Sequence, residues 1–272
     1  MIGKMLRVDL KRGTSLLKWM LAILSVCSLM VIGSWDEMGY IIEAEQWTWL
    51  GAIDLLENQM QFDTYKVVIV ILLSGLYTGS ICRDIRSRYQ RQILYRVDLQ
   101  TYVASRFLSN TIVIIVTFVI SCYLFAGVIM LIGFPVITEN AEGGLLGASY
   151  YTEWMIEVPY LYIGLIGLQF GMIVSAFSSI GLLFSAYQQD AFICIGVSAF
   201  AFFVVVSVSA FWLGNPFDVL TLMGMQPTLP TGRETPLYLS FAWGMLYPAL
   251  VIALCSLKFY RKMKERVVNG II

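Results

Sequence analysis

The sequence predicts an all-α polytopic membrane protein in which six transmembrane helices form a single domain over residues 1–272. Of its 272 residues 58% are hydrophobic and 13% are charged, whereas a soluble domain is nearer half apolar and a quarter charged. Six apolar stretches each reach the roughly 20 residues of helix that cross a hydrocarbon layer. They are too long and too continuous for the strands of a barrel, the other architecture that satisfies backbone polar groups in lipid.

The expected order of elements follows from these stretches. We predict spans at about 15–35, 65–82, 107–134, 158–187, 191–213 and 237–258. The first is too long and too poorly terminated for a cleaved signal peptide, so we expect it to remain in the protein. The five cysteines lie in or at the ends of spans without CxxC or metal-ligand spacing, which indicates neither a disulfide framework nor a metal site.

Charge separates the two sides of the predicted bundle. All but two of the 18 lysines and arginines lie in or beside three segments, the N-terminal start 1–14, the loop 83–106 and the tail 259–272. Most acidic residues lie in the other loops. The positive-inside rule therefore predicts that the three basic segments, and with them both termini, are cytoplasmic. Two termini on one side require an even number of spans, and six satisfies this.

The loop 83–106 carries six arginines, which admits two interpretations. Such a loop can simply hold the second and third spans in orientation and touch anionic lipid headgroups. It can also bind a partner, because Ile85, Tyr89, Ile93 and Val97 recur every four residues. That spacing predicts one helix with a single apolar stripe, of the kind that lies on a membrane or fills a groove in another protein.

Catalytic arrangements are missing from the sequence. The chain has no histidine, which excludes Ser/His and Cys/His nucleophile pairs. No charged residue interrupts the six apolar cores, which argues against an aspartyl intramembrane protease and an ion-coupled transporter. No phosphate-binding G-x-x-x-x-G-K-[ST] loop is present. We therefore expect no enzymatic activity, no catalytic residues and no cofactor bound by this chain.

Two spans carry further patterns. Small residues recur every four positions in the fourth span, at Gly167, Gly171, Ser175 and Ser179. This seam lets another helix approach closely, and packing within the chain is favoured over a dimer contact. The fifth span is rich in Phe and Val, so a substrate-lining role is one reading and a lipid-facing or core surface the commoner one. The candidate lining residues are Phe200, Phe203 and Phe211.

This layout resembles the membrane subunit of a type 2 ABC exporter. The segment "MIGKMLRVDLKRGTSLLKWML" is similar to the amphipathic elbow helix that leads into that family's first span. In the loop after the second span, Asp84 stands near the family's acidic position and Ser105–Arg106 replaces its Gly-Lys, while the family's Gly-Thr and Pro are absent. The segment "GNPFDVL" at 214–220 resembles the Asn-Pro-Phe element often found after the fifth span.

The resemblance implies partners and a mechanism. Loop 83–106 would be a coupling helix seated in a separate cytoplasmic ATPase, which would carry the ATP and Mg, and a second permease subunit would complete a homo- or heterodimer. Ile85, Tyr89 and Ile93 would form the buried side of the ATPase contact, with charged residues at its rim. The expected contact residues are Asp84, Ile85, Arg86, Arg88, Tyr89, Arg91 and Ile93. The remaining expectations are a multi-pass location in a bacterial plasma membrane, contact with lipid and no nucleic-acid partner.

The sequence leaves open both the substrate and the class of protein. The outer loops are rich in acidic residues, which favours a cationic amphipathic peptide, such as an antimicrobial peptide, over lipids, small drugs and ions. The alternative is a non-transport membrane scaffold, immunity or signalling protein whose basic loop binds lipid or a regulator. An intramembrane enzyme is a distant third.

Overall fold

The computed structural model describes residues 2–13, 15–43, 50–61, 65–86, 89–137, 152–209, 219–223 and 237–269. Throughout these ranges the regular structure is helical, which confirms the predicted all-α class. Six of the helices are long and apolar enough to cross a membrane, as the sequence predicts. They are α2 (Leu16–Gly33), α5 (Lys66–Arg86), α7 (Leu99–Ile132), α9 (Pro159–Ser185), α10 (Ala191–Val208) and α12 (Leu237–Val268).

Five of the six begin within one residue of the predicted starts, and α7 is the exception. It starts at Leu99 rather than at 107 because Asp98 caps it: the Asp98 carboxylate accepts a hydrogen bond of 3.0 Å from the backbone N–H of Thr101. With 34 residues at about 1.5 Å each, α7 is some 50 Å long, longer than a hydrocarbon layer of about 30 Å. Its first turns therefore extend beyond the apolar layer or tilt within it.

The last helix continues into the segment predicted as the tail 259–272. Residues 259–268 are the final turns of α12. Phe259 and Met263, four positions apart, are 1% and 0% exposed and pack in an apolar cluster, whereas Arg261 and Lys264 are exposed. The last turns are thus amphipathic, and their apolar face is held by the rest of the bundle.

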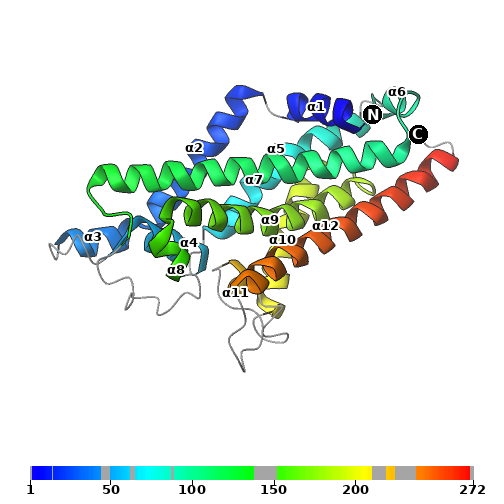
Figure 1. The fold of residues 1–272 in the computed structure, drawn as a ribbon. Coiled ribbons are helices and arrows are strands. Elements are labelled where there is room, and N and C mark those ends of the chain that lie inside the picture. Colours follow the sequence, from blue (N-terminus) through cyan, green and yellow to red (C-terminus); the bar gives the residue numbers. More distant parts are fainter. Residues whose placement is uncertain are drawn as a thin grey trace.

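Helix α9 forms the centre of the bundle and packs against α5, α7, α10 and α12 (Figure 1). In the most apolar stretch of α9, 72% of the residues are buried inside the protein, whereas the corresponding share is 22% in α2 and 17% in both α10 and α12. The outward faces of these three peripheral helices carry exposed Leu, Ile, Val and Phe side chains. Such faces are unfavourable in water and suited to lipid, which supports a multi-pass membrane protein.

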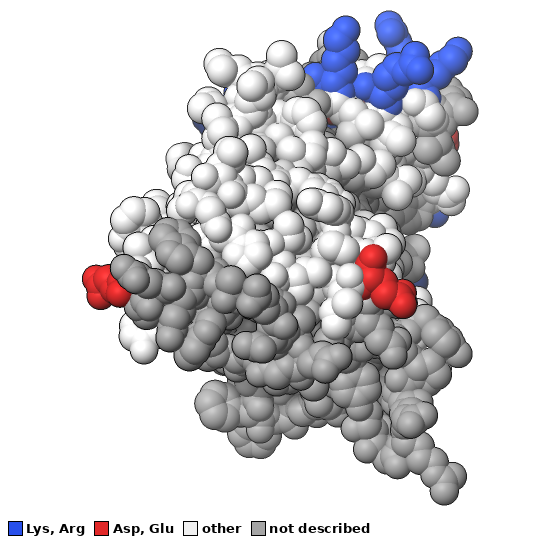
Figure 2. All heavy atoms as spheres, turned by 60° about the vertical axis from the view of Figure 1, so that its left-hand side comes forward, with Lys and Arg blue, Asp and Glu red and all other residues white. Residues whose placement is uncertain are grey.

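Short helices gather at the two ends of the bundle (Figure 1). One end carries α1 (Ile2–Gly13), α6 (Tyr89–Leu94) and the last turns of α12, and the other carries α3 (Trp35–Glu43), α4 (Ala52–Gln61), α8 (Thr152–Glu157) and α11 (Val219–Met223). Figure 2 shows that the Lys and Arg side chains visible on one face stand together at a single end, apart from the visible Asp and Glu side chains. On this face the charges of the described residues are therefore separated as the sequence predicts.

Candidate functional site

The connection from α5 to α7 is the candidate site. The predicted stripe of Ile85, Tyr89, Ile93 and Val97 does not lie on one helix, because α5 ends at Arg86, α6 spans Tyr89–Leu94 and a turn follows. The backbone N–H groups of Arg96 and Val97 bond to the carbonyl of Ile93 and close that turn. Spacing alone did not reveal the turn that ends α6.

The expected contact residues are distributed over different environments. Asp84 and Ile85 are both 7% exposed in the last turn of α5, and Ile85 packs in an apolar cluster with Phe107 and Phe259. This chain therefore already covers Ile85, and its contact with another subunit stays a prediction. Arg86 is exposed, and Ile93 is half-buried against the same cluster. Residue Arg88 and the side chains of Tyr89 and Arg91 lie outside the described part.

A buried charge network lies at the base of this connection and joins three helices. The guanidinium of Arg106 on α7 is 2.6 Å from Oδ2 of Asp84 on α5 and 3.3 Å from Oδ1 of Asp9 on α1. Ser105 donates a hydrogen bond of 2.6 Å to Oδ2 of Asp9. Arg106 and Asp9 are each 1% exposed, so solvent screens this network very little. We call Asp9, Asp84, Ser105 and Arg106 the Arg106 network.

Two tyrosines extend the Arg106 network. The Arg106 guanidinium donates a long hydrogen bond of 3.5 Å to the hydroxyl of Tyr77, and its centre lies 5.2 Å from the ring centroid of Tyr102. Sequence analysis placed Asp84 and Arg106 at the two ends of the loop and missed both their pairing and Asp9. The one available signal was that Asp9 is the sole acidic residue in the basic start 1–14.

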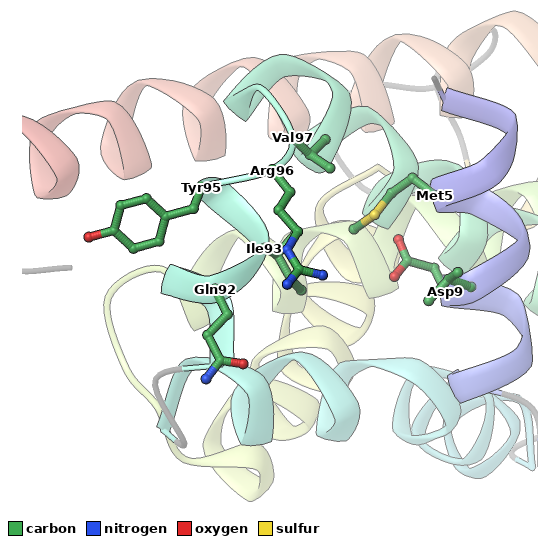
Figure 3. A pocket seen from close by; sticks show the side chains of 8 residues that line it. Met5, Asp9, Gln92, Ile93, Tyr95, Arg96 and Val97 are labelled. Carbon is green, nitrogen blue, oxygen red and sulfur yellow. The ribbon is translucent and has the colours of Figure 1, made fainter.

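A cleft opens beside this network, between α1 and the α6 turn. It has a volume of about 620 Å³. Its apolar lining comes from Met5, Val8, Ile93 and Val97, and its polar lining from Asp9, Gln92, Tyr95 and Arg96. Figure 3 shows the Arg96 side chain reaching into the cleft between Ile93 and Asp9, while Tyr95 projects away from it. We refer to this hollow as the α1–α6 cleft.

The small-residue seam of α9 faces α7. A Cβ added to Gly167 would lie 3.1 Å from the Cα of Val119, and one added to Gly171 would lie 3.0 Å from the Cα of Ile115. Contacts this short with backbone atoms mean that the two helices approach at a distance only glycine allows. Ser175 and Ser179 are fully buried and bond to backbone carbonyls of their own helix. The seam at the two glycines is thus used for packing within the chain, the favoured reading.

The candidate lining residues lie on the outside of this single chain. Phe200 and Phe203 on α10 are 69% and 63% exposed, and Phe211 lies outside the described residues. The pattern of the fifth span therefore corresponds to an outward face in one copy of the chain, as the commoner reading of such a pattern expects.

The opposite end holds a buried carboxyl that sequence analysis did not single out. Glu57 on α4 is 7% exposed and accepts a hydrogen bond from the hydroxyl of Tyr162 on α9. Burial raises the pKa of Glu57 to about 7, the Tyr162 hydrogen bond opposes this, and the charge of nearby Asp54 adds to it. The described residues contain no group of three or more His, Cys, Asp or Glu side chains placed to hold a metal ion.

Comparisons with known proteins give no match: no protein-family model, no curated protein and no solved structure is similar to this chain.

Proposed function

We propose that this chain is the permease subunit of an ATP-driven exporter of the ABC class, working with a separate cytoplasmic ATPase and a second permease subunit. One observation carries the proposal. The short helix α6 stands between two long spans at the basic end of the bundle, and the Arg106 network ties together the helices on both sides of it. A displacement of α6 by a bound ATPase would therefore move α5, α7 and α1 together, and would not be absorbed by a flexible loop.

The charge distribution supports the orientation that this role requires. The exposed basic residues of α1, α5 and α12 share one end with α6, and by the positive-inside rule that end is cytoplasmic. Acidic residues of α3 and α4, among them Asp36, Glu37 and Glu43, lie at the other end. An acidic outer face attracts a cationic amphipathic substrate, which makes a peptide the first candidate.

A non-transport membrane scaffold is the second candidate, and one observation favours it. The apolar side chain Ile85 is covered by this chain, and Gln90 of α6 is buried with its amide against the sulfur of Met263. This leaves less apolar surface for an ATPase than a fully exposed coupling helix offers. In that role the basic end binds lipid or a regulator.

Co-purification with matched variants separates the two. The chain is tagged at its C-terminus, extracted gently from its native membrane and analysed by mass spectrometry, as wild type and with Gln92→Trp on α6 or Val267→Trp on the last turn of α12. Both positions are exposed. The exporter predicts a stoichiometric ATPase with wild type and Val267→Trp that is depleted with Gln92→Trp. Recovery of the chain without any ATPase would refute the exporter and leave the scaffold.

A further inference from the structure

We propose that the α1–α6 cleft is a binding site for an anionic phospholipid, whose phosphate is held by Arg96 and whose first acyl carbons lie on Met5, Val8 and Ile93. The inference does not depend on the proposed transport function, because it concerns only the membrane face of this chain.

The lining of the cleft is amphiphilic in a way that fits a lipid. Met5, Val8, Ile93 and Val97 are apolar and incompletely buried, with Val8 51% exposed. Leaving such a surface in water is unfavourable, and at the end of a transmembrane bundle the abundant apolar molecule is lipid. The volume of about 620 Å³ lies within the ~300–1,000 Å³ usual for small-ligand sites.

The polar side of the cleft selects for negative charge. The guanidinium of Arg96 reaches into the cleft, and Gln92 adds an amide from the same wall (Figure 3). Arginine binds phosphate with charge-assisted, often bidentate hydrogen bonds. The one carboxylate of the lining, Asp9, is only 1% exposed and is already paired with Arg106. Arg106 is shared with Asp84, so it offsets part of the Asp9 charge, and the Arg96 guanidinium adds a further positive charge on the cleft side.

The surroundings add charge complementarity. Lys4, Arg7 and Lys11 on α1 are exposed, as are Arg83 and Arg86 at the end of α5. Basic residues at a membrane surface attract anionic headgroups. This general attraction concentrates anionic lipid near the cleft, while the cleft itself distinguishes one lipid from the bulk through the position of Arg96.

The test is native mass spectrometry of the full chain in micelles titrated with phosphatidylglycerol or phosphatidylcholine. We expect one tightly held phosphatidylglycerol that phosphatidylcholine does not replace. Arg96→Gln removes the charge from the phosphate contact and is expected to weaken this site about tenfold. Arg261→Gln, which removes an exposed arginine from α12, is the matched control and is expected to leave the site unchanged.

A second variant addresses the apolar part of the site. Val8→Trp places a large ring in the cleft without altering its charge and is expected to reduce the tight occupancy as well. Thermal unfolding of each variant checks that it is folded. Equal binding of the two lipids, or full phosphatidylglycerol binding by both Arg96→Gln and Val8→Trp, would overturn the proposal. Displacement of phosphatidylglycerol by soluble glycerol phosphate at matched concentration would also overturn the proposal, because the site would then recognise the phosphate group alone and not the lipid.

Discussion

Removing the arginine from the Arg106 network is the most direct test of the fold at the basic end. In Arg106→Met, two carboxylates lose their cation while they remain 1% and 7% exposed, at Asp9 and Asp84. Breaking a buried pair in this way costs about 3–5 kcal/mol, because an unpaired charge is left in a poorly solvated site. A substitution at an exposed position such as Arg261 costs about 0.5 kcal/mol or less.

The measurement is the free energy of unfolding in mixed micelles, from titration with a denaturing detergent and readout by circular dichroism. A triple variant that adds Asp9→Asn and Asp84→Asn to Arg106→Met sharpens the test. It removes both stranded charges, so most of the lost stability is expected to return. The reasoning is refuted if Arg106→Met is no more destabilising than Arg261→Met, or if the triple variant is less stable than the single one.

Three further predictions concern other parts of the bundle. The pKa of the Glu57 carboxyl is raised from its ordinary value of 4.5 to about 7. The contribution of this group to stability is therefore fully present below pH 4.5 and is lost as the pH rises through about 7. Glu57→Gln is expected to remove this pH dependence from thermal unfolding curves, and an unchanged pH profile in the variant would contradict the prediction. Gly171→Leu is expected to lower the free energy of unfolding by about 1–3 kcal/mol, because the added side chain overpacks the α7–α9 contact. Gly79→Leu is the control, since nothing lies within 4 Å of a Cβ added there, and it is expected to change the free energy of unfolding little. Equal effects of the two substitutions would show that the seam is not tight. The thiols of Cys82 on α5 and Cys194 on α10 lie within hydrogen-bonding reach of each other. A membrane-permeant oxidant is therefore expected to join them in a disulfide, which peptide mass mapping without reduction would detect. Absence of the disulfide-linked peptide would place α5 and α10 further apart.

The number and starts of the spans are predictable from sequence because lipid leaves the backbone few choices. An apolar run of sufficient length has to form a helix there, so five of the six starts are recovered to within one residue. The helix α7 begins before the span predicted from 107, because hydropathy marks where lipid begins, not where a helix begins. The missing signal was Asp98, whose carboxylate accepts a hydrogen bond from the N–H of Thr101 and so caps the start of the helix.

The candidate site was less predictable because it depends on contacts between distant residues. Nothing in the local pattern indicates that Asp9 pairs with Arg106, since they lie 97 positions apart and each has other charged residues near it in the sequence. A recurrence every four residues is a property of an unbroken helix, and it does not reveal the turn after Leu94 that leaves Val97 outside α6. The spacing of Gly167 and Gly171, by contrast, marked a close approach correctly, because a helix without side chains at four-residue intervals has one obvious use in a bundle.

The Arg106 network also bears on the order in which the chain is assembled during synthesis. Asp9 precedes the first two spans in the chain, whereas Arg106 follows them, so Asp9 is translated well before this partner. Until Arg106 is made, the contact that joins α1 to α7 in the Arg106 network cannot form. Insertion of the third span delivers Arg106 to Asp84 and Asp9 together. A chain interrupted before residue 106 therefore lacks the side chain that joins α1, α5 and α7 in the Arg106 network.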